Sequence, residues 1–160
     1  MEYKFRKIAE SDNSIIAGII RKNLEQFGLD IPGTSYFDTN LDHLSDCYED
    51  ERSGYYVLID GDGTVLGGIG YSAFPIMRDT AELQKMYLDP SFKGYGLGYG
   101  MIRYAEEQMR ASGFKRSYLE THDNLQAAIH IYEKTGYMEI DKPEQIGHSA
   151  MNRFYIKDLT

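Results

Sequence analysis

The sequence predicts a mixed α/β fold in a single domain that spans residues 1–160. Short apolar runs typical of strands occur in both halves of the chain, and segments with apolar residues at helical spacing lie between them. The chain has no internal repeat, low-complexity tract or linker. Its length suits one sizeable core, and its 42% apolar and 26% charged residues are typical of a folded globular protein.

The first half of the chain is expected to begin with a strand over residues 2–9. Ser11 or Asp12 is positioned to cap the helix that follows, where isoleucine and leucine residues recur at helical spacing. Residues 31–35 have the composition of a loop, and a second helix is expected over residues 40–51. A glycine-rich turn then predicts a β-hairpin, whose strands cover residues 55–60 and 64–74.

The second half alternates strands and helices. Each expected helix carries apolar residues at three- and four-residue spacing and ends at a glycine. Strands are expected at residues 81–89, 116–121, 137–141 and 151–158, and helices begin near Leu97 and Leu125 and end at Gly113 and Gly136.

Charge and cysteine content restrict the partners. The net charge of −8 makes nucleic acid a poor partner and favours cationic small molecules such as amines. A single cysteine, Cys47, excludes a disulfide framework and zinc sites with paired thiolates, so no metal site is expected. A pair with His43 on the predicted helix is conceivable, but a small apolar residue on a helix face is the favoured interpretation of Cys47.

Membrane and export signals are not recognised in the sequence. No apolar run approaches the ~20 residues of a membrane span. The first residues lack the apolar stretch of a secretory signal. The simplest expectation is a cytoplasmic protein without a membrane partner.

Four alternating glycines, Gly94, Gly96, Gly98 and Gly100, stand between a predicted strand and a predicted helix. Glycine opens backbone paths closed to other residues and lets a ligand approach the amides. The first amides of a helix lack partners and carry the positive end of its dipole. With Lys93 beside it, the loop predicts an anion site.

Two familiar phosphate loops do not match this pattern. A P-loop needs lysine directly after its last glycine, whereas Tyr99 follows Gly98. A dinucleotide fingerprint needs a third glycine three positions after the second, where this chain has Tyr99 or Met101. Taken alone, the loop leaves a turn without a ligand as the alternative.

The residues around the loop resemble a known family. Residues 82–90 followed by Lys93-Gly94-Tyr95-Gly96-Leu97-Gly98 resemble motif A of the GNAT acetyltransferase superfamily, R/Q-x-x-G-x-G/A after a strand. Residues 124–137 resemble its next motif, an Asn–Ala–Tyr helix that ends in Gly-aromatic. Lys93 departs from the usual Arg or Gln, because it keeps a charge but lacks the planar fork.

The resemblance implies a central mixed, mostly antiparallel sheet flanked by helices, and acetyl-CoA as acyl donor. It implies that the loop amides bind the pyrophosphate and that the preceding strand pairs with the pantetheine arm like an added strand. The amide of Met86 would polarise the thioester carbonyl. The cofactor-binding residues it implies are Met86, Leu88, Lys93, Gly94, Tyr95, Gly96, Leu97, Gly98, Tyr99 and Asn124.

Direct acetyl transfer needs a neutral amine and a proton for the departing thiolate. Glu82 is the leading base, since regular pairing would place its side chain on the same strand face as Gln84, Met86 and Leu88. The alternative is a carboxylate that is exposed or only binds the amine. His122, at a strand end, is a second candidate base.

Tyr132 is the leading general acid. An ordinary phenol has a pKa near ~10 and can protonate a thiolate, and the resemblance places such a tyrosine beside the sulfur. The alternative is a core aromatic on the apolar face of its helix. His130 is expected to be exposed.

The acceptor is expected to be a small-molecule amine or an amino acid. Alternatives are a protein N-terminus or lysine, and an inactive acetyl-CoA sensor. In the family, the acceptor pocket is built by the N-terminal helices and by loops near the last strands, and residues 28–40 and 141–150 of this chain carry no motif that identifies the acceptor. Tyr36 and Phe37 either line this pocket or pack in the core. Dimers are frequent in the family, so a homodimer is a further expectation.

Overall fold

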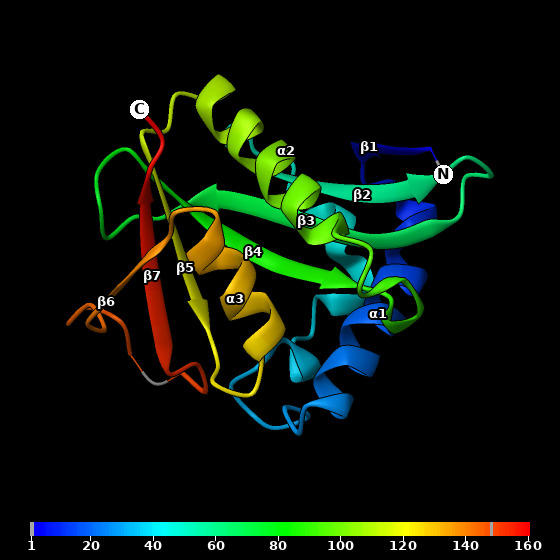
Figure 1. Ribbon diagram of the computed structural model, residues 1–160, viewed down its shortest axis with the longest axis horizontal. Coiled ribbons are helices and arrows are strands. Elements are labelled where there is room, and N and C mark those ends of the chain that lie inside the picture. Colours follow the sequence, from blue (N-terminus) through cyan, green and yellow to red (C-terminus); the bar gives the residue numbers. More distant parts are fainter. Residues whose placement is uncertain (1, 148) are drawn as a thin grey trace.

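The computed structural model describes residues 2–147 and 149–160. One seven-stranded sheet, in the order β1-β2-β3-β4-β5-β7-β6, organises these residues (Figure 1). Only the pairing of β4 with β5 is parallel, which confirms the expected mixed and mostly antiparallel sheet. The strands are β1 (Tyr3–Lys7), β2 (Gly54–Asp60), β3 (Val65–Ala73), β4 (Thr80–Leu88), β5 (Arg116–Thr121), β6 (Met138–Ile140) and β7 (Arg153–Asp158).

Helices cover both faces of the sheet. Figure 1 shows α2 and α3 on the near face and α1 behind. Each face has its own buried core, one beneath α2 and α3 and one beneath α1 and the turns η2 and η3. The helical segments are η1 (Glu10–Asp12), α1 (Asn13–Gln26), η2 (Ser35–Phe37), η3 (Leu41–Cys47), η4 (Pro90–Phe92), α2 (Leu97–Ala111) and α3 (Gln126–Lys134).

The helix expected at residues 40–51 is wrong. Leu41–Cys47 forms a 3-10 segment whose backbone leaves helical geometry at His43. The segment contains two Asp and one Ser, which compete with helix hydrogen bonds, and Asn13 of α1 holds it by bonds to the amide and hydroxyl of Ser45. Cys47 is exposed rather than packed on a helix face.

The cap expected at the start of α1 is confirmed in position but not in its hydrogen bond, since Asp12 is the N-cap residue and its side chain makes no capping bond. The carboxylate of Asp12 turns back instead of capping the helix. It accepts a hydrogen bond from the amide of Ala9 at 2.8 Å and forms a two-bond ion pair with Arg6 at 2.7 and 2.9 Å. These bonds lower the pKa of Asp12 and tie the end of β1 to the helix.

Strand β4 contains a β-bulge. Its register with β3 shifts between Gln84 and Tyr87, so that Lys85 and Met86 lie opposite a single residue of β3. Lys85 adopts a left-handed conformation with a φ of 50°. The hydroxyl of Tyr55 donates to the Lys85 carbonyl at 2.8 Å and helps to hold this conformation.

The bulge overturns the prediction that Glu82, Gln84, Met86 and Leu88 share one face. One extra residue reverses the alternation of side chains along the strand. Leu83 before the bulge and Met86 and Leu88 after it pack in the core beneath α2 and α3. Glu82 and Gln84, joined by a hydrogen bond, point to the α1 side.

β4 and β5 separate beyond their first residues, as Figure 1 shows. In the described part of the chain they pair only at Thr80–Glu82 with Arg116–Tyr118. The edge of β4 that follows Glu82 is therefore open to an added strand. None of the described helices is both long and apolar enough to cross a membrane.

Candidate active site

The glycine loop forms an open helix N-terminus. Gly94 and Gly96 adopt left-handed φ values of 88° and 74°, which glycine takes without steric cost. Gly96 is the N-cap residue of α2 and has no side chain to satisfy the first amides of the helix. The amides of Leu97, Gly98 and Tyr99, together with the helix dipole, form a cradle for an anion.

Gly98 also allows α2 and α3 to approach closely. A Cβ at this position would lie 2.8 Å from Cδ1 of Ile131 on α3. A larger residue here would force the Ile131 side chain to move, since carbon atoms prefer about 3.5–4.0 Å.

A groove of about 430 Å³ joins the loop to β4 and α3. It brings together eight of the ten predicted cofactor residues. Tyr95 is 70% exposed and lies outside the lining, as does Asn124. The predicted residues that line the groove are Met86, Leu88, Lys93, Gly94, Gly96, Leu97, Gly98 and Tyr99, and the exposed His130 joins them from α3.

The C-terminal end of α1 and the next residue, Phe27, contact three predicted cofactor residues. The ammonium of Lys93 lies 4.7 Å from the ring centre of Phe27, and burial lowers the Lys93 pKa. The Asn124 amide donates to the Phe27 carbonyl at 2.8 Å. The carbonyl of Leu88 accepts a hydrogen bond from Asn23 at 2.9 Å. The end of α1 is therefore held between the two predicted cofactor motifs.

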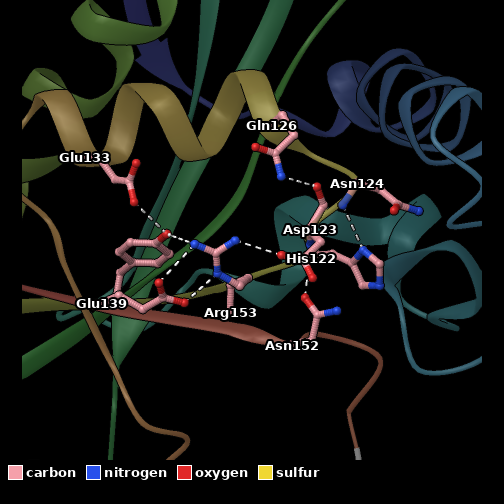
Figure 2. Close-up of polar contacts among 9 residues, drawn as sticks. His122, Asp123, Asn124, Gln126, Glu133, Glu139, Asn152 and Arg153 are labelled. Atoms are coloured by element: carbon pink, nitrogen blue, oxygen red, sulfur yellow. Dashed lines mark hydrogen bonds and ion pairs between the residues drawn. The ribbon is translucent and has the colours of Figure 1, made fainter.

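The turn before α3 is held by ion pairs, which Figure 2 shows. Arg153 of β7 donates to Asp123 at 2.7 Å and forms a two-bond pair with Glu139 of β6. Hydrogen bonds to these two carboxylates raise the pKa of Arg153. Within the turn, Nδ1 of His122 accepts the amide of Asn124 at 3.0 Å, so this nitrogen is occupied when His122 is neutral.

Tyr132 lies in the core and also lines the opening between β4 and β5. It is 7% exposed, and its ring centre lies 5.9 Å from that of Tyr137 and 6.4 Å from that of Tyr155. It lines the cavity between the separating strands with Met86. Burial raises its pKa, so the hydroxyl keeps its proton at neutral pH. Tyr132 therefore packs in the core and also borders the opening, so its position is compatible with both interpretations made from the sequence.

Glu82 faces a second pocket, on the α1 side of β4. Gln84 donates to Glu82 at 2.9 Å and accepts the hydroxyl of Tyr48 at 2.7 Å. Burial raises the pKa of Glu82, the hydrogen bond from Gln84 opposes this shift, and the nearby charge of Glu120 adds to it. The pocket measures about 210 Å³ and is lined by Gly33, Thr34, Ser35, Glu82, Leu83, Gln84, Lys85, Tyr87, Glu120, Ser149 and Met151.

Comparison with known proteins decides the family. Residues 9–137 match the model of the acetyltransferase (GNAT) family. The chain belongs to the GNAT family. Its seven-stranded fold is the one that the sequence predicted, and it is an acetyltransferase that takes its acetyl group from acetyl-CoA.

Relatives and solved structures agree with this assignment. The uncharacterized N-acetyltransferase YjgM of Escherichia coli K12 is 39% identical over 138 residues, which cover 85% of this chain and 82% of the relative. A GNAT acetyltransferase from Staphylococcus aureus Mu50 has a TM-score of 0.86 at 18% identity and covers 99% of this chain and 100% of its own. PaiA N-acetyltransferase from Thermoplasma acidophilum, solved with coenzyme A, has a TM-score of 0.76 at 18% identity, with 99% of each chain covered. At these identities the solved structures show the fold.

The second pocket of this GNAT chain contains residues that sequence reasoning missed. Lys85 and Glu120 were not singled out, because a bulge and a strand pairing have no local sequence signal. Residues 28–40 and 141–150 both reach this pocket, through Thr34 and Ser149. Tyr36 and Phe37 lie outside its lining; Phe37 is 59% exposed. Within residues 2–147 and 149–160 no cluster of His, Cys, Asp or Glu suited to a metal ion is found.

Proposed function

We propose that this chain transfers the acetyl group of acetyl-CoA to a primary amine of a small molecule or amino acid, by direct attack in a ternary complex. The opening between β4 and β5 carries this proposal. Its lining shares Met86 and Tyr87 with the glycine-loop groove. It shares Leu83 and Glu120 with the second pocket, which contains Glu82 and Glu120 and is called the carboxylate pocket below. The groove and the pocket therefore meet at one place.

The groove is assigned to the cofactor. We infer that the amides of residues 94–99 bind the pyrophosphate, with Lys93 as a supplementary charge. The open edge of β4 at Met86 pairs with the pantetheine arm, and Leu88 contributes its apolar side chain. Asn124 holds the end of α1 through Phe27 and so borders the cofactor site instead of lining the groove.

Two proton transfers are assigned to residues on opposite sides of the opening. Glu82 takes a proton from the ammonium of the acceptor, directly or through a water molecule, and its raised pKa brings it closer to that of the amine. The nitrogen then forms its bond to the acetyl carbon as the carbon–sulfur bond breaks. Tyr132 gives its proton to the departing sulfur, and the second proton that the nitrogen loses as the amide forms passes to solvent, from which Tyr132 is reprotonated. His122 is the second candidate base.

A small acceptor is supported by the size and charge of its pocket. The pocket is only about 210 Å³, and the chain carries a net charge of −8, which attracts cationic amines.

The cytoplasmic location and the homodimer stay predictions.

The test is the release of free CoA from acetyl-CoA with a panel of alkylamines, amino acids, polyamines and short peptides with free N-termini. We expect release with a free amine or amino acid. Release with peptides alone would identify a protein acetyltransferase. Binding of acetyl-CoA without release by any amine would identify an inactive sensor.

A further inference from the structure

Lys85 occupies a backbone conformation that a side chain disfavours. Its φ of 50° lies in the left-handed region, where glycine is the ordinary residue. Among the residues that the structure describes, Asp79, with a φ of 55°, is the only other residue besides glycine with a positive φ. Strained residues that carry a side chain where glycine would fit more easily cluster at functional sites. The position therefore raises the question of what the lysine side chain does there.

The ammonium of Lys85 has only a loose partner. Its nitrogen lies 3.6 Å from Oδ2 of Asp38, beyond the usual hydrogen-bond distance. The Lys85 side chain is 21% exposed, whereas that of Asp38 is 48% exposed. Lys85 lines the carboxylate pocket and also an adjoining cavity of about 350 Å³ that contains Asp38. The Lys85 ammonium therefore lies at the wall of the pocket and could bind an anionic group more closely than it binds Asp38.

Two carboxylates stand in the same pocket. Glu82 of β4 lies opposite Tyr118 of β5, and Glu120 follows two residues later on β5. The hydroxyl of Tyr118 donates to Glu120 at 2.9 Å and holds it in place. Both carboxylates line the same pocket, and the charge of Glu120 raises the pKa of Glu82. This pair attracts an ammonium group.

We propose that the acceptor is a zwitterion of the amino-acid type, whose ammonium is bound by Glu82 and Glu120 and whose carboxylate is bound by Lys85. The inference rests on the proposed function and names its acceptor class. All three side chains line one pocket of about 210 Å³, so a short molecule can reach them together. A second cation on the acceptor, as in a polyamine, would be repelled by Lys85.

The experiment compares acetylation of each common amino acid with that of its carboxamide, which keeps the amine and removes the carboxylate. Wild type and Lys85→Gly are measured with both. Comparing the ratio of kcat/KM values between enzymes cancels the intrinsic reactivity of each amine. We expect wild type to prefer the acid, and Lys85→Gly to lose about ten- to hundredfold of that preference, as expected for one charge-assisted hydrogen bond. Activity on the amides should fall less than activity on the acids.

Asp79→Gly is the matched control. It relieves the same backbone strain, but Asp79 lies in the loop before β4, outside the lining of the pocket. Its kinetics should equal those of wild type. If Lys85→Gly does not fold, Lys85→Met serves instead, since it keeps the stem and removes the charge.

The outcomes separate the two proposals. An unchanged acid-to-amide ratio in the Lys85 variant, or a preference of wild type for polyamines, overturns the zwitterion inference and leaves amine acetylation standing. Failure of wild type to acetylate any acid, amide or other amine overturns the proposed function and this inference with it. If Lys85→Arg, which keeps the positive charge, prefers the acid as wild type does, the result supports the role of the charge.

Discussion

On the α2 and α3 side of β4, the groove is lined mainly by glycines and apolar side chains, with Lys93 and His130 at its wall. On the α1 side, the pocket lining includes two carboxylates and a lysine. Half of the residues that line the groove come from one continuous segment, the loop at residues 93–99 and the helix that follows it. The pocket takes its charges from two strands, β4 and β5, and its remaining wall from loops far apart in the sequence.

This difference separates what a family shares from what distinguishes its members. Backbone amides can bind a common donor whatever the side chains are, provided that glycines keep the path open. Charged side chains select one acceptor over another, because an unmatched charge in a small pocket is costly. Substitutions in the groove should therefore weaken acetyl-CoA binding, whereas substitutions in the pocket should change the choice of acceptor.

The largest effect is expected for Gly96→Val. A β-branched residue with left-handed φ distorts the amide cradle, and losing two charge-assisted hydrogen bonds weakens acetyl-CoA binding about hundredfold or more. Calorimetry measures the affinity. Gly113→Val is the control, since Gly113 has a φ of 90° at the end of α2, away from the groove. Both variants should lose roughly 1–2 kcal/mol of stability, but affinity should fall only at Gly96. Equal affinities would remove the loop from the cofactor site.

Tyr132→Phe should lower kcat by roughly hundredfold, the usual contribution of a general acid, while the acetyl-CoA affinity stays within a few-fold. Tyr137→Phe is the comparison. It removes a hydroxyl bonded to Ser117 at 2.8 Å and should cost about 1 kcal/mol of stability with normal turnover. If Tyr132→Phe turns over like wild type at every pH, the tyrosine is a core residue only.

The pH–rate profile tests the acceptor side. The base must be ionised, so the rate should fall as pH falls through the pKa of Glu82, which burial and Glu120 raise above the ordinary glutamate value. Glu82→Gln should lose this limb. Glu120→Gln should shift it to lower pH, because a like charge is removed while Lys85, whose charge lowers the pKa of Glu82, remains. An intact limb in Glu82→Gln would transfer the role to His122 or water.

The smallest effect is expected for Lys93→Gln, which introduces a residue common in the family. Its charge stands over Phe27, and a partly exposed charge contributes about 1 kcal/mol or less, so affinity should fall by no more than about fivefold. Calorimetry at two salt concentrations checks this. A hundredfold loss would mean that Lys93, rather than the amides, binds the anion.

The sequence revealed the fold and the glycine loop because both depend on local patterns. Alternating glycines before a helix define the backbone directly, and the mixed, mostly antiparallel sheet follows from the family resemblance. The bulge at Lys85 could not be foreseen, since Lys is not a residue that usually marks left-handed backbone, and it reversed the expected direction of Met86 relative to Glu82. The 3-10 segment at Leu41–Cys47 was missed because Asn13, far away in the sequence, holds it in place.

The contrast between the two sides of β4 can be measured by following the backbone amide signals in a ¹⁵N–¹H spectrum as CoA is added, and then an amino acid. CoA should produce its largest shifts at residues 94–99 and at Met86, with little change at Glu120. The amino acid should then shift Lys85 and Glu120 most. If CoA instead shifts Glu120 and leaves the amides of Gly96 and Gly98 unchanged, the assignment of the groove to the cofactor is wrong.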